Sequence, residues 1–372
     1  MMASASAGRL RLLPHRLLPW LADRTRAAHW ILPALALLLA GALLRPYPLR
    51  AQPLLGGCPV FPAGNIWNTP VDGLPVHERS DDYIEAIGRD APVHPDFGAG
   101  LYEGGPIGIP YVVVPADQPL VEIEFAAYGD ESDPGPYPIP PDAPIEGGAA
   151  ADGDRHVLAL QQGTCKLYEL YRAFPLNGGW RADAGAVFDL RSHALRPAGW
   201  TSADAAGLPI LPGLVRYEEV AAGEIAHALR FTAPETQRLY VWPARHYASS
   251  LTSLAYPPMG QRFRLRADID LDSFSPQVQV IVRAMQRYGL ILADNGSPWY
   301  LSGAPDERWD NDLLRELRRL RGSDFEAVDV SSLQLHPDSA QVRPSAPPPG
   351  PYHLYIALVL TTTDLLAQRA PR

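Results

Sequence analysis

The sequence predicts an all-β-dominated fold, a two-sheet antiparallel β-sandwich of the jelly-roll type with two helices late in the chain. Three observations support this prediction. The 372 residues include 40 prolines and 31 glycines, which is typical of many turns and few long helices. Eight strand-like runs are separated by turns rich in these two residues. The two longer helical patterns follow the strands, so the helices are expected to pack against the outside of the sheets.

The clearest of the predicted strands is at 262–272. There apolar residues such as Phe263 and Leu265 alternate with charged ones, which predicts one buried face and one face in water. Three aspartates of the charged face resemble the start of a calcium-binding loop, but Ser273 and Gln279 stand where such a loop needs glycine and glutamate. A solvated face is therefore the preferred interpretation. The predicted strands are 109–116, 120–128, 155–162, 165–174, 185–190, 225–233, 238–247 and 262–271.

The helical patterns have recognisable ends. A short helix is predicted from Ser80 to Gly88. Ser275 begins a longer one, whose apolar residues recur at i, i+3, i+4 and i+7, and Asp310 begins the last. Between the second and third strands, the proline-rich loop at 129–153 is too long to be a simple connection, and its prolines favour an ordered rim.

Residues 1–51 are expected to be a signal peptide or a membrane anchor. An arginine-rich stretch precedes an apolar run at 30–44, which is shorter than the roughly 20 residues that a stable transmembrane helix needs. If this segment is not cleaved, it is the expected membrane attachment. We expect a single β-sandwich domain at 52–334, then a proline-rich linker and an apolar tail at 335–372. Export would place the protein in the cell envelope or outside the cell.

The chain contains two cysteines, Cys58 and Cys165. In an exported protein they meet an oxidising compartment, so we expect a disulfide bond between them; two unpaired buried cysteines are the alternative. Closing a loop of this length stabilises a fold by about 4–5 kcal/mol in the chain-entropy model.

The charge balance argues against several classes of partner. Beyond residue 50 the chain carries 25 basic and 40 acidic residues. Such an acidic body repels phosphate backbones, so nucleic-acid binding is disfavoured. Lys166 is the only lysine, and neither a GxxxxGK[ST] nor a GxGxxG motif occurs. We expect no cofactor and no metal.

Glu169 is the leading candidate for a catalytic general acid. It lies in the strand-like run KLYELY, where loss of contact with water would raise its pKa. A buried glutamate paired with an arginine such as Arg172 is the alternative.

A second carboxylate is expected from Asp204 or Asp183, as base or nucleophile. Asp204 lies in the loop GWTSADAAGLPILPG at 199–213, where Ser202 can cap one helical turn. Ser202 lacks the GxSxG context of a hydrolase nucleophile, so a serine hydrolase is not favoured.

Aromatic residues and histidines supply the candidates for substrate binding. Trp180, Trp200 and Trp299 each follow glycine or proline, so they are interpreted as loop residues that either pin the loop to the core or offer a flat surface on which a sugar stacks. His227 and His246 lie in strand-like runs and are candidates for the same site.

Four stretches of the chain resemble a family of exported bacterial proteins. They are FPAGNIWNTPVDGLPVHERS, GTCKLYELYRAFP, GWTSADAAGLPILPGLVRYEEV and YGLILADNGSPWYLSGAPDERW. The resemblance covers about 58–330 and implies export and a single domain. It brings no activity, and therefore no catalytic residue.

The function expected from these features is action on a polysaccharide or other glycan, as a glycoside hydrolase with paired carboxylates. A non-catalytic carbohydrate-binding or envelope-structural module is the first alternative. A metal-dependent hydrolase that uses His156, His227 and His246 is the second, although no HExxH or HxH spacing joins these histidines.

Overall fold

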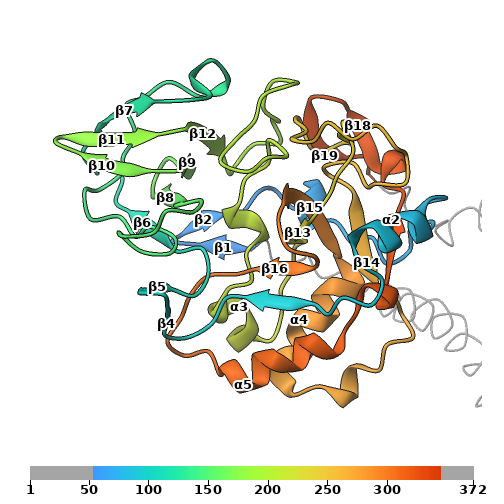
Figure 1. Cartoon of the computed structure of the whole chain (residues 1–372). Helices are drawn as coiled ribbons and strands as arrows, with labels where there is room; N and C mark the ends of the chain where they lie inside the picture. Colours follow the sequence, from blue (N-terminus) through green and yellow to red (C-terminus); the bar gives the residue numbers. More distant parts are fainter. Residues whose placement is uncertain (1–52, 345–372) are drawn as a thin grey trace, which may run out of the picture. The chain divides into compact units, whose positions relative to one another are not determined.

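The computed structural model describes residues 53–344. The expected signal peptide or anchor and most of the expected tail lie outside this range. Within it, no helix combines the length and the hydrophobicity that crossing a bilayer requires. The described residues belong to one compact unit. The fold is dominated by strands, as predicted, and its strands are distributed over several sheets (Figure 1).

Three sheets carry most of the strands. The six-stranded sheet has the order β17-β14-β15-β13-β16-β3, the four-stranded sheet β12-β9-β8-β6 and the three-stranded sheet β10-β11-β7. Three further pairs, β1 with β2, β4 with β5 and β18 with β19, form small two-stranded sheets. The bounds are β1 Leu54–Leu55, β2 Cys58–Pro59, β3 His94–Asp96, β4 Leu101–Tyr102, β5 Gly105–Pro106, β6 Tyr111–Val114, β7 Glu122–Phe125, β8 Val157–Gln161, β9 Lys166–Tyr171, β10 Phe174–Leu176, β11 Gly179–Ala182, β12 Ala184–Asp189, β13 Leu229–Ala233, β14 Arg262–Leu265, β15 Leu290–Asn295, β16 Tyr300–Ser302, β17 Phe325–Val328, β18 Gln334–His336 and β19 Ser339–Val342.

The sheets mix parallel and antiparallel pairs, so the expectation of purely antiparallel sheets is wrong. The pairs β6–β8, β7–β11, β13–β15 and β3–β16 are parallel. Parallel pairing requires a long connection that returns the chain to its starting end. The loop at 129–153 lies within such a connection between β6 and β8, and α4 lies within the one between β13 and β15. The two-sheet sandwich expected from the sequence stays a prediction.

The four described α-helices are short, except α4. They are α2 Ser80–Ile87, α3 Tyr217–Ala222, α4 Pro276–Arg287 and α5 Asn311–Leu314. The prediction of α4 is confirmed: it begins after Ser275 and turns Val278, Ile281 and Met285 into the core. It contacts β14 of the six-stranded sheet. The last predicted helix makes one α-helical turn and continues as a 3-10 helix at Arg315–Arg319.

One predicted strand is wrong, and another is wrong in part. The run at 238–247 forms no strand, and a single bridge joins Tyr240 to Met259. The run at 262–271 ends as a strand at Leu265. Its Arg262, expected in water, is buried because its guanidinium donates hydrogen bonds to the carbonyl oxygens of Tyr288 and Ile66.

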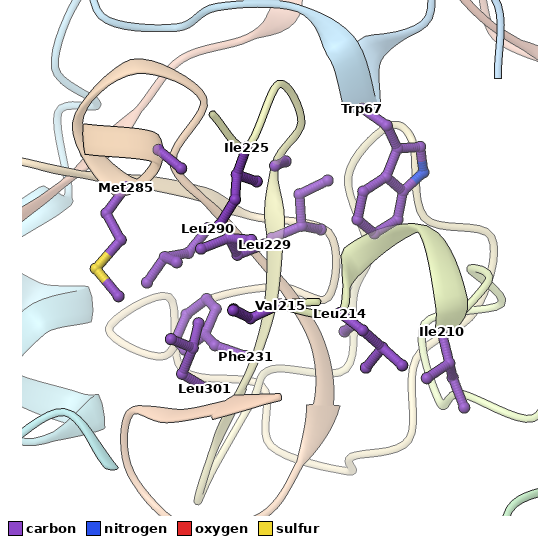
Figure 2. Packing of buried hydrophobic residues seen from close by; sticks show 14 of the residues in the cluster. Trp67, Ile210, Leu214, Val215, Ile225, Leu229, Phe231, Met285, Leu290 and Leu301 are labelled. Atoms are coloured by element: carbon purple, nitrogen blue, oxygen red, sulfur yellow. The ribbon is translucent and has the colours of Figure 1, made fainter. Parts of the chain in front are cut away.

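The main hydrophobic core surrounds the six-stranded sheet. Figure 2 shows Leu229 and Phe231 of β13 among Leu290, Leu301 and Met285, which come from a neighbouring strand on each side and from α4. A second cluster packs the four-stranded sheet against the three-stranded sheet. The loop at 129–153 contributes to this second cluster, with Tyr137, Ile139, Ala143 and Ile145 buried in it. The loop is therefore anchored through its middle part, residues 137–145.

The strand pair β18–β19 occupies residues expected to begin a linker. Antiparallel bridges attach it to the body of the protein, between Gln341 and Asn65 and between Ser339 and Ala194. The Asp338 carboxylate also accepts a hydrogen bond from Arg245 at 2.6 Å. These contacts make the hairpin part of the folded unit.

The disulfide bond between Cys58 and Cys165 is confirmed. Their Cα atoms are 5.4 Å apart, and both residues are buried. The bond ties β2, near the start of the folded unit, to the residue just before β9. β9 is an interior strand of the four-stranded sheet, so the bond fixes the amino-terminal segment to the centre of that sheet.

Candidate functional site

A cavity of about 240 Å³ lies where the four-stranded sheet meets the six-stranded sheet. Tyr171 comes from the end of β9 and Asp294 from the end of β15. The segment at 201–205 forms another part of the wall. The polar side chains of the lining include Asp154, Asp204, Asp294, His246, Tyr128 and Tyr171.

Asp204 is held rigidly by Arg230 of β13. Arg230 donates from Nε to Oδ2 of Asp204 at 2.8 Å and from Nη2 to Oδ1 at 2.7 Å. Both side chains are buried. A third hydrogen bond runs from Nη1 of Arg230 to Ser302 Oγ at 2.6 Å. This bidentate, charge-assisted pair fixes the position of the Asp204 side chain at the edge of the cavity.

Asp294 differs from Asp204 in both its contacts and its charge state. Its Oδ2 is 3.4 Å from Nη2 of Arg230, which is already committed to Asp204. Its own side chain remains 22 % exposed. Burial, together with the neighbouring Asp204 carboxylate, raises the pKa of Asp294 to about 8. Asp294 therefore carries a proton at neutral pH.

Asp154 also lines the cavity and is exposed to solvent. Its charge is one of the influences that raise the pKa of Asp294, so the two carboxyl groups act on each other. The cavity thus combines a carboxyl group that keeps its proton and a second one in contact with water. This is the division of roles that acid–base catalysis by two carboxyl groups requires.

His156 lies beneath the cavity and links two of its loops. Its Nδ1 is 2.6 Å from Oε2 of Glu146, and its Nε2 is 2.9 Å from the carbonyl oxygen of Ala203. Burial opposes the charged imidazolium, but the Glu146 carboxylate outweighs burial and raises the pKa of His156 to about 9. Both nitrogens therefore donate hydrogen bonds, and the ring acts as a cationic brace between 129–153 and 201–205.

Glu146, Asp154 and His156 are also the described residues that could bind a metal ion. Their ligand atoms lie within 4.8 Å of one another. A metal ligand must be a neutral imidazole with a free nitrogen lone pair, and here both nitrogens of His156 face acceptors. An ion would have to displace a proton and a strong hydrogen bond, so the donor set fits a metal poorly.

No helical turn forms at 203–206, so the prediction that Ser202 caps one is wrong, and Ser202 instead closes a turn with its side chain. Its Oγ accepts a hydrogen bond from the Asp204 backbone N–H at 2.9 Å and donates to the carbonyl oxygen of Leu208 at 2.6 Å. The hydroxyl is thus committed at both ends to the loop that presents Asp204.

Glu169 is buried beside Asp204 and does not line the cavity. Its carboxyl group accepts hydrogen bonds at 3.0 Å from the backbone N–H groups of Ile210 and Leu211, where a 3-10 helix begins. Burial raises the pKa of Glu169 to about 7, although these two hydrogen bonds oppose the rise. The structure places it behind the cavity, where it caps the segment that follows the 201–205 wall.

Two of the three tryptophans are inside the protein. Trp180 is buried in the second core cluster, and Trp299 is stacked between Phe231 and Phe325. Neither offers a face to a sugar. Trp200 is half-buried, with the Arg196 guanidinium 5.5 Å from its ring. The aromatic side chains in the cavity wall are instead Tyr128 and Tyr171.

Of the remaining candidates, His246 alone lines the cavity, with Nδ1 donating to the carbonyl oxygen of Ala205 at 2.8 Å. His227 belongs to a separate buried cluster with Glu219 and Arg216. Asp183 is paired with Arg172 at 3.0 Å, outside the lining. The structure therefore brings Asp204 and His246 together and leaves His227 and Asp183 apart from them.

Sequence reasoning missed Asp154 and Asp294. Asp294 begins the polar stretch DNGS at 294–297, and Asp154 lies between the loop at 129–153 and the predicted strand at 155–162. An acidic residue at the end of a strand-like run is the signal that could have singled them out. No protein-family model, curated protein or solved structure matches this chain.

Proposed function

We propose that this is an exported protein that hydrolyses glycosidic bonds, with Asp294 as the general acid and Asp154 as the second carboxylate. The observation that carries the proposal is the pair itself. One carboxyl group of the cavity keeps its proton to a pH of about 8, while another on the same wall is exposed to water. Canonical glycoside hydrolases use such a pair.

The proposed reaction balances as a single displacement. Asp294 gives its proton to the glycosidic oxygen as the bond from that oxygen to the anomeric carbon breaks. Asp154 takes a proton from the water molecule that adds to the anomeric carbon. The products are a glycan with a new reducing end and a glycan with a new non-reducing end. Asp294 then regains a proton from solvent and Asp154 releases one before the next turnover.

The other residues of the site support these two. Asp204, held by Arg230, raises the pKa of Asp294 and so helps Asp294 to keep its proton. Tyr128 and Tyr171 supply the aromatic surface that sugars favour. The cavity is smaller than the roughly 300–1,000 Å³ of a drug-sized ligand site, so we expect it to hold one ring of a longer glycan.

A reducing-sugar screen over a panel of polysaccharides tests the proposal. We expect the wild-type protein to release reducing ends, and Asp294→Asn to lower that rate by about 10²–10⁴-fold. The matched control is Asp183→Asn, which alters an aspartate outside the cavity and should leave the rate unchanged. Binding of a glycan without release of reducing ends would instead favour a carbohydrate-binding module.

The configuration of the first product tests the role of Asp154. A base at this position gives a product with inverted anomeric configuration, and NMR of the fresh reaction detects it. A retained configuration would show that Asp154 attacks the anomeric carbon directly.

A further inference from the structure

The cavity wall contains acidic side chains that no lysine or arginine among its described residues balances. Three of its side chains are aspartates, and none of the described residues that line it is a lysine or an arginine. With Asp294 protonated and the Asp204 charge balanced by Arg230, the exposed Asp154 carboxylate still leaves negative charge at the site. A ligand that carries uronate, sulfate or phosphate groups would meet repulsion here.

The two cations beneath the cavity are each balanced by a carboxylate, Arg230 by Asp204 and His156 by Glu146. Arg230 has committed all three of its nitrogens, two to Asp204 and one to Ser302. His156 is held between Glu146 and the carbonyl oxygen of Ala203. Because the nitrogen atoms of both cations are hydrogen-bonded to protein groups, neither cation is free to bind an anionic group of a ligand.

Asp154, in contrast, has a carboxylate that faces water. Within residues 53–344 this carboxylate forms no side-chain hydrogen bond or ion pair, although it lies within 4.8 Å of the ligand atoms of Glu146 and His156. Tyr128 and Tyr171 stand in the same wall. A carboxylate beside aromatic rings is a combination that receives an ammonium group, through the ion pair and through attraction of the cation to the ring faces.

We propose that the substrate is a glycan of 2-amino sugars with free amino groups. This inference rests on the proposed glycoside hydrolase activity. The amino group of such a sugar is bonded to the carbon next to the anomeric carbon. A ring placed with its anomeric carbon near Asp154 therefore brings its ammonium group near the same carboxylate. The acidic body of the protein, with 40 acidic against 25 basic residues beyond residue 50, also attracts a polycation.

Matched polymers test the substrate class. Oligomers of glucosamine, the same oligomers after full N-acetylation, and oligogalacturonate are offered to the protein at low salt. We expect kcat/KM for the free-amine oligomer to exceed that for the acetylated one by at least about tenfold. We expect this advantage to shrink as salt is added, because screening weakens exposed ion pairs. Galacturonate should be the poorest of the three.

A binding experiment separates recognition of the amine from catalysis. It uses Asp294→Asn, which removes the proposed acid, and the double variant Asp294→Asn/Asp154→Asn. Calorimetry should show that the double variant binds the free-amine oligomer at least about tenfold more weakly than the single variant, with little change for the acetylated oligomer. Asp294→Asn/Asp183→Asn is the matched control and should bind like the single variant.

The outcomes are distinguishable. Release of reducing ends from the acetylated or acidic oligomers in preference to the free-amine oligomer overturns the substrate class and leaves the hydrolase in place. Binding of the free-amine oligomer with no release from any polymer supports the recognition of amines and overturns the hydrolase. Neither binding nor release of the amine oligomer overturns the inference.

Discussion

Arg230 and Asp204 are joined by two parallel hydrogen bonds, at 2.8 and 2.7 Å, inside the protein and directly behind the candidate site. The pair connects β13 of the six-stranded sheet to the loop that forms a wall of the cavity. The pair also acts on Asp294: burial and then the Asp204 carboxylate raise the pKa of Asp294, while the Arg230 guanidinium opposes the rise. The organisation of the site depends on this contact.

Breaking the pair should be costly for stability. Arg230→Gln leaves the Asp204 carboxylate buried without a counter-charge, so we expect the free energy of unfolding to fall by about 3–5 kcal/mol. Urea denaturation at pH 7 measures this loss in the free energy of unfolding relative to the wild type. Adding Asp204→Asn to this variant should restore part of the loss.

The half-exposed pair of Arg172 with Asp183 provides the control, and Arg172→Gln should cost only about 0–1 kcal/mol. Equal losses in Arg230→Gln and Arg172→Gln would contradict the importance of the buried pair.

The proposed hydrolase should lose activity as the pH rises through about 8. The raised pKa means that Asp294 holds its proton below this pH and loses it above, so the acid form disappears on the alkaline side. The measurement is kcat/KM between pH 5 and 10 on the best substrate of the screen. An unchanged rate up to pH 10 would show that Asp294 is not the general acid.

Glu169 should affect stability rather than catalysis. Its pKa is about 7 in the folded protein against an ordinary value of 4.5, so the folded state retains a proton that the unfolded state releases between these values. Stability is therefore lost as the pH rises from about 4.5 to 7, and the loss amounts to about 3 kcal/mol at 1.4 kcal/mol per pH unit.

In Glu169→Gln this pH-dependent loss should be absent. Denaturant unfolding at pH 4.5 and pH 7.5 compares the variant with the wild type. Relative to the wild type, the free energy of unfolding of the variant should be about 3 kcal/mol higher at pH 7.5 than at pH 4.5. The release of reducing ends should persist. A folded Glu169→Gln protein without activity would return the role of general acid to Glu169.

The disulfide bond should contribute strongly to stability. It closes a loop between residues 107 positions apart, and removing it should lower the free energy of unfolding by about 4–5 kcal/mol. Cys58→Ser/Cys165→Ser, compared with the wild type by thermal unfolding without reductant, measures the loss. Reductant should lower the Tm of the wild type and leave that of the variant unchanged; equal Tm values for both proteins would contradict the prediction.

Local patterns were sufficient for much of the scaffold. The bounds of α4 follow from Pro276 in its first turn and from the spacing of its apolar residues, which are properties of neighbouring positions. β8, β9 and β12 lie within predicted strands or differ from them by a single residue, because alternation and turn residues act over a few positions. The same reasoning failed at 238–247, where an apolar composition resembles a strand but one bridge is formed.

The site required the three-dimensional arrangement. Arg230 reaches Asp294 because β13 and β15 pair in parallel, and this register aligns Thr232 with Asp294. Nothing in the periodicity of either strand specifies which strands become neighbours. Asp154 reaches the same cavity from the end of a loop whose anchoring residues, such as Tyr137 and Ile139, are in the second core cluster.

The sequence by itself determined the strand-rich composition, the pairing of the only two cysteines, the position of α4 and the candidacy of Asp204. These depend on residue type and short spacing, which the chain carries locally. Only the tertiary structure decided that Glu169 faces backbone N–H groups behind the cavity, and that Asp294 and Asp154 share its wall. A carboxyl group acquires its pKa from the charges and the burial around it, and residues distant in sequence supply both.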